Sequence, residues 1–278
     1  MPGTLYVVAT PIGNLEDVTL RALRVLREVS VIAAEDTRRS SRLLQHYSIS
    51  TPTTSLHEHN ETARTPGLIA RLLGGESVAV VSDAGTPVVS DPGARLVAAA
   101  HAAGIRVEPV PGPSAALAAV SGSGIGGDEF LFVGFPPARA AQRRTWLGNL
   151  AGEDRPIVLY EAPHRIRDTL QDMLAIFGDR TLALGRELTK AHEELVVRPI
   201  SAHLSELKEG RGEYTLVVAP PVAQIAAPEV PGAHDMAAEF GRITDTTTSS
   251  RRDAIRQLAT KYGLKAREVY SLVEQGLK

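Results

Sequence analysis

The chain has 278 residues, no cysteine and a net charge of −2, and 43% of its residues are hydrophobic. This length allows one large core or two moderate ones, and the lack of cysteine excludes disulfides, thiolate catalysis and cysteine-ligated zinc. No apolar run reaches the roughly 18 residues of a membrane span, and no basic region precedes the first apolar stretch. We therefore expect a cytoplasmic protein without a membrane anchor.

The charge is unevenly distributed along the chain. Residues 241–278 carry eight Lys or Arg against four Asp or Glu, a net charge of +4, which leaves −6 for residues 1–240. A basic tail on an acidic body can contact a polyanion, and it can equally be a solvated helical hairpin. Charge alone leaves both interpretations open.

The first 110 residues alternate strand and helix patterns. Short apolar runs predict strands over residues 4–9, 31–34, 77–81 and 106–110. The segments between them predict helices, the first capped by Thr19 and the others over residues 37–46, 62–73 and 93–103. Short apolar strands separated by helices indicate a parallel sheet covered on both faces. Residues 1–113 are therefore predicted to form an N-terminal α/β domain.

The same pattern restarts after residues 111–124, which are predicted to begin with a turn and to continue as a helix of small residues. Strand-like runs recur at FLFVGF, IVLYEAP, TLALGREL and EYTLVVA, which predicts a second α/β domain over residues 114–220. Residues 221–233 are rich in Pro and Ala and are predicted to be a linker. Residues 234–278 are predicted to be a helix-turn-helix-like hairpin, with Ser250 capping one helix and Gly263 ending it.

Four predicted strand ends carry unusual turns: ATPIGN, AAEDTR, SDAGTP and PGPSA. In open parallel sheets, ligands bind beyond the carboxyl ends of the strands, so one cleft could collect these four turns. The sequence has neither a three-glycine dinucleotide fingerprint nor a P-loop, which disfavours a polyphosphate ligand. S-adenosylmethionine, which has no phosphate, fits this pattern better.

A run of motifs appears in a family-specific order: TLYVVATPIGNLEDVTLRAL, AAEDTRRSSRLL, HEHN, VSDAGTPVVSDPG, VPGPSA, FVGFPP, YEAPHR and RELTKAHEE. In this order they resemble the tetrapyrrole-methylase superfamily, and more narrowly its branch that methylates small-subunit ribosomal RNA. The resemblance extends from Thr4 to Ala219 and includes the tail hairpin. It implies two α/β domains with S-adenosylmethionine in the cleft between them, usually in a homodimer.

The resemblance also implies an activity and a cofactor site. The branch methylates the ribose 2′-hydroxyl of a cytidine in the decoding region of 16S ribosomal RNA, so the expected partner is the small ribosomal subunit. The implied cofactor-binding residues are Pro11, Gly13, Asp83, Ala84, Gly85, Thr86, Ser114 and Ala115. The second turn, SDPG, is instead predicted to cap the next helix through Ser90 or Asp91, with Pro92 at its first position.

Methyl transfer from a sulfonium is a displacement that depends on alignment and on help in deprotonating a poor nucleophile. Glu187 or Lys190 could assist deprotonation or hold the ribose, and they are the candidate catalytic residues. The structural alternative is a set of ion pairs, Arg186–Glu187 or Arg165–Glu161. Glu35 and Asp36 could similarly form an acid–base pair, but capping the helix and pairing with Arg38 or Arg39 is favoured.

Contacts with RNA need cations. The candidates are Arg139, Arg143 and Arg144 after FVGFPP, and Arg251, Arg252 and Arg256 in the tail. Aromatic residues make up only 4% of the chain, which argues against a broad base-stacking platform. His57 and His59 have no acidic partner at metal-ligand spacing, and the chemistry needs no metal, so no metal site is expected.

The sequence is also compatible with two other functions. One is a methylase of the same fold that acts on a tetrapyrrole of the precorrin or uroporphyrinogen type, which the cofactor half cannot distinguish. The other is a non-catalytic DNA-binding regulator that uses the tail hairpin. The basic tail and the motifs YEAPHR and RELTKAHEE favour RNA, and the predicted second helix of the hairpin offers few polar side chains to read bases.

Overall fold

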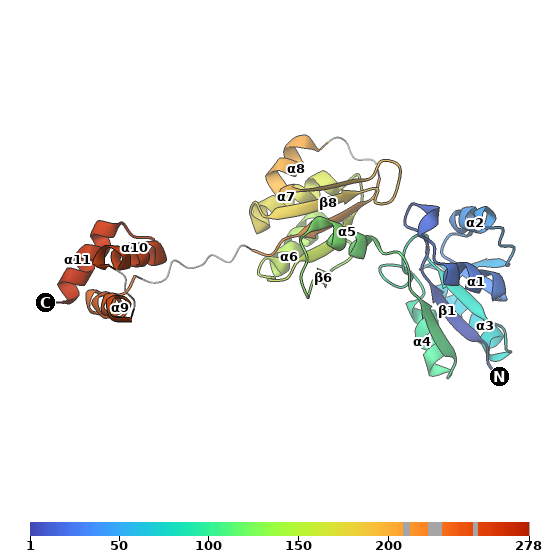
Figure 1. Ribbon diagram of the computed structural model, residues 1–278. Helices are drawn as coiled ribbons and strands as arrows, with labels where there is room; N and C mark the ends of the chain where they lie inside the picture. Colours follow the sequence, from blue (N-terminus) through green and yellow to red (C-terminus); the bar gives the residue numbers. More distant parts are fainter. Residues whose placement is uncertain (208–211, 222–229, 247–249, 278) are drawn as a thin grey trace. The chain divides into compact units, whose positions relative to one another are not determined.

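The computed structural model describes residues 1–207, 212–221, 230–246 and 250–277. It divides into two compact units, Met1–Pro220 and Pro221–Lys278, which are described separately below (Figure 1). No helix among the described residues combines the length and apolar character that crossing a membrane requires.

The first unit begins with a five-stranded parallel sheet in the order β3-β2-β4-β1-β5. Its strands are β1 (Thr4–Val8), β2 (Val31–Ala34), β3 (Thr53–Ser55), β4 (Val78–Val81) and β5 (Arg106–Val110). Its helices are α1 (Leu20–Glu28), α2 (Thr37–His46), α3 (Glu61–Leu73) and α4 (Ala94–Ala102), and a short 3-10 helix, η1, covers Leu15–Asp17. Of these strands, only β3 was not predicted, because its sequence, TTS, has no apolar run.

Both faces of this sheet are buried, as predicted. In β2, Ile32 and Ala34 point into a core shared with α1 and α2, whereas Val31 and Ala33 point into a core shared with α3 and α4. Successive side chains of a strand alternate between the two faces of its sheet, so a strand covered on both sides needs an unbroken apolar run. Thr19 caps α1 by accepting a hydrogen bond from the backbone of Ala22, as predicted.

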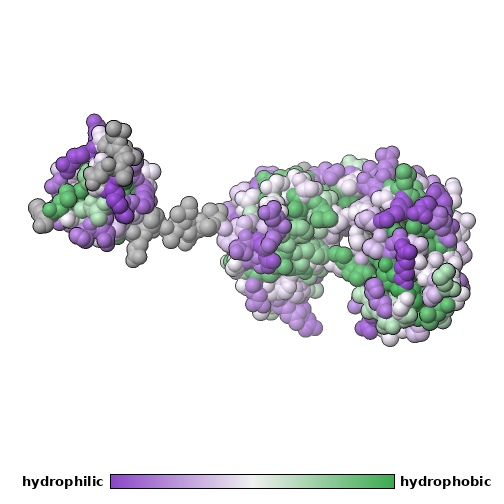
Figure 2. All heavy atoms as spheres, turned by 60° about the horizontal axis from the view of Figure 1, so that its bottom comes forward, coloured by the Kyte–Doolittle hydropathy of each residue, from purple (hydrophilic) through white to green (hydrophobic). Residues whose placement is uncertain are grey.

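The second sheet of this unit has the order β6-β7-β10-β8-β9. Its strands are β6 (Leu131–Phe132), β7 (Ile157–Glu161), β8 (Thr181–Arg186), β9 (Glu194–Pro199) and β10 (Tyr214–Val218). Only β6 and β7 are parallel, and the other pairs are antiparallel. The helices are α5 (Ala115–Ser123), α6 (Ala140–Leu150), α7 (Ile166–Phe177) and α8 (Ile200–Glu206). In the space-filling view a notch separates the two halves of this unit (Figure 2).

The start of α4 corrects a prediction from the sequence. The N-cap is Gly93, with a φ of 117°, and Pro92 precedes the helix instead of opening it. Ser90 and Asp91 do not cap it, because the buried carboxylate of Glu61 accepts hydrogen bonds from the backbone N–H groups of Gly93 (3.1 Å), Arg95 (2.8 Å) and Leu96 (3.3 Å). The carboxylate of Glu61, on a neighbouring helix, thus accepts the hydrogen bonds of the free N–H groups at the start of α4. The side chain of Asp91 is not needed as a cap.

The second unit contains the predicted hairpin, now α10 (Arg251–Tyr262) and α11 (Ala266–Gly276), and a third helix, α9 (Ala233–Thr246). Ser250 caps α10 by accepting from the backbone of Asp253, and Gly263 ends it with a φ of 64°. The α9 helix was not predicted; it shares an apolar core with the other two through Met236 and Phe240. Most of the linker predicted over residues 221–233 lies outside the described residues.

Candidate functional site

Three strand ends of the first sheet are tied together by hydrogen bonds. The turn 82–87 after β4 meets the loop after β1, where Thr10 and Gly85 form an isolated bridge. The same turn meets the loop after β2, because Asp83 accepts from the backbone of Asp36 (3.0 Å) and Glu35 accepts from the backbone of Asp83 (3.1 Å). Parallel strands end at the same edge of a sheet, and this edge carries the expected ligand turns.

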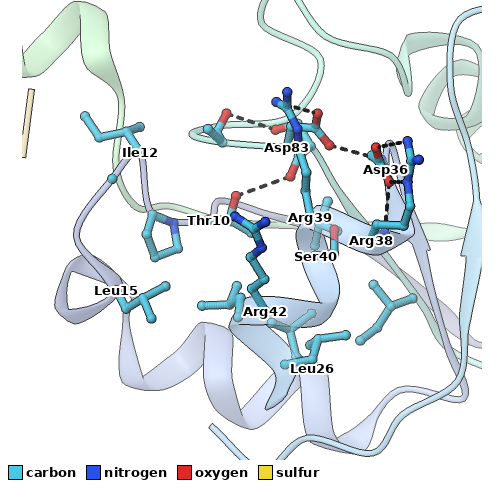
Figure 3. A pocket seen from close by; sticks show the side chains of 18 of the residues that line it. Thr10, Ile12, Leu15, Leu26, Asp36, Arg38, Arg39, Ser40, Arg42 and Asp83 are labelled. Atoms are coloured by element: carbon cyan, nitrogen blue, oxygen red, sulfur yellow. Dashed lines mark hydrogen bonds and ion pairs between the residues drawn. The ribbon is translucent and has the colours of Figure 1, made fainter. Parts of the chain in front are cut away.

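Several cavities open at this edge, and two of them are lined by the expected ligand turns. The smaller one, which we name the motif pocket, has a volume of about 400 Å³. The larger one, the arginine pocket, has a volume of about 750 Å³ and appears in Figure 3. The two share six lining residues, Ile12, Arg39, Asp83, Ala84, Lys190 and Glu213, so they adjoin each other at the turn 82–87.

The motif pocket gathers most of the residues that the resemblance assigned to the cofactor. These are Asp83, Ala84, Gly85, Thr86, Ser114 and Ala115. Thr86 Oγ1 donates to the carbonyl of Pro113 (3.1 Å), and Ser114 caps α5 by accepting from the backbone of Leu117 (3.5 Å). These contacts fix the shape of the pocket, and the cofactor role of its residues stays a prediction.

The other two candidates, Pro11 and Gly13, line the arginine pocket. A Cβ atom at Gly13 would lie 2.4 Å from Lys190 Cγ and 2.8 Å from Thr189 Oγ1. The missing side chain therefore allows the loop after β8 to approach the loop after β1. A hydrogen bond from the backbone of Asn14 to Thr189 Oγ1 (3.0 Å) closes the same contact.

The motif pocket is rich in carboxylates. Burial raises the pKa of Asp91 to about 6, the nearby charges of Glu35 and Asp83 act in the same direction, and a hydrogen bond with Ser82 opposes them. Burial also raises the pKa of Glu35. Arg39, 3.0 Å from Asp83, and Lys190 are the cations among the lining residues. A pocket with a negatively charged lining favours a cationic ligand and disfavours a polyphosphate.

The candidate catalytic residues lie in the loop after β8. Lys190 Nζ is 3.0 Å from a carboxylate oxygen of Glu187 and 3.2 Å from one of Glu213. Glu187 and Thr189 have left-handed backbones, with φ of 49° and 67°, which L-residues other than Asn and Asp rarely adopt. Lys190 lines both pockets, whereas Glu187 is behind it and contacts it.

The pKa values of Glu187 and Lys190 are shifted in opposite directions. Burial acts to raise the pKa of Glu187, but hydrogen bonds from the backbone of Glu213 and from Lys190 outweigh it and lower the pKa. Burial acts to lower the pKa of Lys190, but its bonds and charge pairing with Glu187 and Glu213 outweigh it and raise the pKa. Glu187 is therefore a weak base, and Lys190 is a protonated donor at the boundary of the two pockets.

The predicted structural roles of several charged residues are confirmed. Asp36 caps α2 by accepting from the backbone of Arg38 (2.9 Å), and it also pairs with the Arg38 side chain (2.8 Å). Glu161 pairs with Arg165 (2.5 Å) and is fully buried. Arg186 lies 3.4 Å from a carboxylate oxygen of Glu194, and its charge also helps to lower the pKa of Glu187.

The candidate RNA-binding arginines fall into separate groups. Arg143 was predicted wrongly as an RNA-binding residue, because it is only 4% exposed and its Nε donates a hydrogen bond to Asp172 (2.8 Å). Arg139 and Arg144 are exposed. In the second unit Arg252 and Arg256 are exposed, and Arg251 lies 3.7 Å from Glu274 and over the ring of Phe240.

The HEHN motif forms the turn before α3, where the side chain of Asn60 accepts from the backbone of His57 (2.9 Å). Within the described part of the chain, no group of three His, Asp or Glu side chains could hold a metal ion.

Sequence reasoning missed Asp91 and Ser40 as pocket residues. The signal available for Asp91 is the second Asp-containing turn after β4, although its sequence, SDPG, favours a helix cap.

Comparison with known proteins gives a consistent result. Residues 4–203 match the family model of the Tetrapyrrole (Corrin/Porphyrin) Methylases. The chain is 50% identical over 248 residues to Ribosomal RNA small subunit methyltransferase I of Pseudomonas aeruginosa, covering 87% of this chain and 86% of that protein. It is 41% identical over 275 residues to the protein of the same name from Halalkalibacterium halodurans, covering 98% and 95%.

Solved structures resemble the chain in fold. A uroporphyrin-III-C-methyltransferase from Thermus thermophilus superposes with a TM-score of 0.55 and 24% identity, covering 81% of this chain and 97% of that one. A diphthine synthase superposes with a TM-score of 0.58 and 15% identity, covering 78% and 90%. At this level of identity the likeness shows the shared fold.

Proposed function

Because the chain belongs to the tetrapyrrole methylase family and, within it, to the ribosomal RNA small subunit methyltransferase I group, we propose that it is an S-adenosylmethionine-dependent ribosomal RNA methyltransferase. Its proposed target is the ribose 2′-hydroxyl of a cytidine in the decoding region of 16S ribosomal RNA. The names of the relatives support the RNA substrate, and the motif pocket supports the cofactor.

The observation that carries the cofactor proposal is the chemistry of the motif pocket. S-adenosylmethionine has a sulfonium and an ammonium group and no phosphate, which matches a pocket lined by Glu35, Asp83 and Asp91. All four residues of the turn 83–86 line this pocket. A Cβ at Gly85 would lie 3.4 Å from Ile12 Cγ2 and 3.7 Å from the carbonyl of Pro113, so the turn is closely packed.

The bound cofactor would supply an electrophilic methyl group, and the chain has to align and activate the acceptor. The two adjoining pockets can place a ribose beside the cofactor, and alignment alone can lower a barrier by several kcal/mol. Lys190, protonated and held by Glu187 and Glu213, is suited to stabilise negative charge that develops on the hydroxyl oxygen. Glu187 would position Lys190 rather than accept the proton, and the proton of the ribose hydroxyl would pass to solvent water as the methyl group is transferred.

We further propose that the protein acts in the cytoplasm on the small ribosomal subunit and that it is a homodimer. The RNA substrate supports the location, and the family resemblance supports the dimer. Sedimentation of the purified protein tests the oligomeric state.

The decisive experiment for the proposed function is methyl transfer to small ribosomal subunits. Radiolabelled S-adenosylmethionine would be incubated with subunits from cells that lack this enzyme, and the modified nucleotide would then be mapped. We expect label on a single cytidine ribose. Label on a base, or activity on a uroporphyrinogen or precorrin but not on subunits, would overturn the proposal.

A further inference from the structure

Three arginines line the arginine pocket from one helix. Arg38, Arg39 and Arg42 lie in the first two turns of α2, where residues i and i+4 share a face. Figure 3 shows Arg39 reaching toward Asp83 and Arg42 reaching toward Thr10. All three residues are exposed, so this wall of the pocket presents guanidinium groups to solvent.

The arginines differ in how they are held. Arg38 is paired with Asp36 (2.8 Å), and Arg39 with Asp83 (3.0 Å). Arg42 makes no side-chain hydrogen bond or ion pair with any residue the structure describes. Two guanidinium groups are thus preorganised by carboxylates and a third is available, an arrangement suited to several phosphate oxygens at once.

A buried hydroxyl on the same helix gives an independent indication of a ligand. Ser40 is only 9% exposed and lines the arginine pocket. Its Oγ atom has no hydrogen-bond partner among the described residues. Buried polar atoms in native structures nearly always have a partner, so an unpaired hydroxyl on a pocket wall indicates a group that arrives with a ligand.

The two adjoining pockets also differ in charge. The arginine pocket is lined by Arg38, Arg39, Arg42 and Lys190 against Asp36, Asp83 and Glu213. The motif pocket has five carboxylates, Glu35, Asp83, Asp91, Glu161 and Glu213, against Arg39 and Lys190. An anionic ligand is therefore favoured in the larger pocket and disfavoured in the smaller one.

We infer that the arginine pocket binds the phosphodiester backbone of the single-stranded RNA segment that carries the target ribose, through Arg38, Arg39, Arg42 and the Ser40 hydroxyl. This inference rests on the proposed function and names the site that holds its substrate. The adjoining position of the two pockets would bring a ribose held by its flanking phosphates next to the motif pocket, with Lys190 at the boundary.

The test measures binding of a fluorescently labelled, single-stranded 16S ribosomal RNA fragment containing the decoding-region cytidine, by anisotropy between 50 and 200 mM salt. Each lost phosphate contact lowers the log–log salt slope by about 0.7 for a single strand. We expect Arg38→Gln and Arg42→Gln each to show this loss and to weaken binding severalfold, and Arg42→Lys to keep the slope. Arg24→Gln, at an exposed arginine of α1 paired with Glu28, is the matched control.

Ser40→Ala provides a second and independent variant. Removal of a buried, unpaired hydroxyl should leave the thermal midpoint unchanged or raise it, because no internal hydrogen bond is lost. We expect weaker RNA binding with an unchanged salt slope. Unchanged RNA binding by Ser40→Ala would contradict the role of this hydroxyl.

Several outcomes would overturn the inference. The slopes of the Arg38 and Arg42 variants could equal that of Arg24→Gln. Arg42→Gln could weaken S-adenosylmethionine binding instead, which would assign the pocket to the carboxylate of the cofactor. Loss of binding to assembled subunits but not to the RNA fragment would indicate a protein contact. These outcomes can be distinguished from a failure of the proposed function, because in that case the wild-type protein itself would transfer no methyl group to small ribosomal subunits.

Discussion

Thr10 and Gly85 exchange two backbone hydrogen bonds, each 2.9 Å long, which join the loop after β1 to the turn after β4. Gly85 adopts a φ of 78° in this bridge and is buried. The turn that lines the motif pocket therefore also joins two strand ends. Substitution at Gly85 should affect both folding and cofactor binding.

We predict that Gly85→Ala lowers the free energy of unfolding by about 1–2 kcal/mol, because L-residues are strained at this φ. It should also weaken S-adenosylmethionine binding. Gly124→Ala is the matched control, since Gly124 has a φ of 66° and a Cβ there would meet no atom within 4 Å. Thermal melts and calorimetry would separate the two effects. Equal cofactor affinity in both variants would contradict a cofactor role for the turn.

Because the pKa of Asp91 is raised, we predict that cofactor binding depends on pH. Its pKa in the folded protein is raised to about 6, so the unliganded protein holds this proton more tightly than the unfolded chain does. The stabilisation from protonation is thus present at low pH and is lost as the pH rises through about 6. A cationic ligand favours the ionised form, so S-adenosylmethionine affinity should fall about tenfold between pH 7 and pH 5.

Calorimetry at several pH values, in buffers of different ionisation enthalpy, would measure both the affinity and the proton release. Asp91→Asn should bind S-adenosylmethionine more weakly at pH 7 and lose most of the pH dependence. Asp128→Asn, at an exposed position outside both pockets, should behave like the wild type. An unchanged pH profile in Asp91→Asn would show that another group is responsible.

Lys190 should act in the chemical step. We predict that Lys190→Met lowers kcat about a hundredfold, as expected for loss of one donor to a developing oxyanion, and leaves the Kd for S-adenosylmethionine within about twofold. Lys190→Arg should recover part of the rate. Because its pKa is raised above the ordinary value, Lys190 should cause no loss of rate between pH 7.5 and 9.5. Single-turnover methylation of small subunits is the measurement, and an unchanged kcat in Lys190→Met would remove Lys190 from the reaction.

The tail should act on the RNA and not on the cofactor. The three helices of the second unit share their own apolar core, so removal of residues 221–278 should leave S-adenosylmethionine affinity unchanged and sharply lower methylation of subunits. Arg252→Ala combined with Arg256→Ala should reproduce part of this loss and reduce the salt slope of RNA binding. A change in sedimentation on truncation, with RNA binding intact, would instead assign the tail to the dimer.

The elements that could be predicted from the sequence are those whose signals are local. The unbroken apolar runs of β1, β2 and β4 predicted a sheet buried on both faces, and Thr19, Asp36 and Ser250 predicted helix starts that the structure confirms. A strand with two buried faces and a helix with a capping side chain each depend on residues within a few positions of one another.

The roles of individual charged side chains could not be predicted, because they depend on partners far away in the sequence. Glu61, 32 residues before Gly93, caps α4 and leaves Asp91 to the motif pocket. Arg143 is buried against Asp172, whereas Arg42, with no comparable partner in the described chain, lines a pocket.

The amino-acid sequence thus determined the strand–helix order, the turns at the strand ends and the family resemblance. The tertiary structure decided which of those turns form one pocket, which carboxylates are buried together, and that the second sheet is mostly antiparallel. The physical reason is that the electrostatic energy of a charged side chain, and the partner with which a strand pairs, depend on groups that are close in space but distant in the sequence.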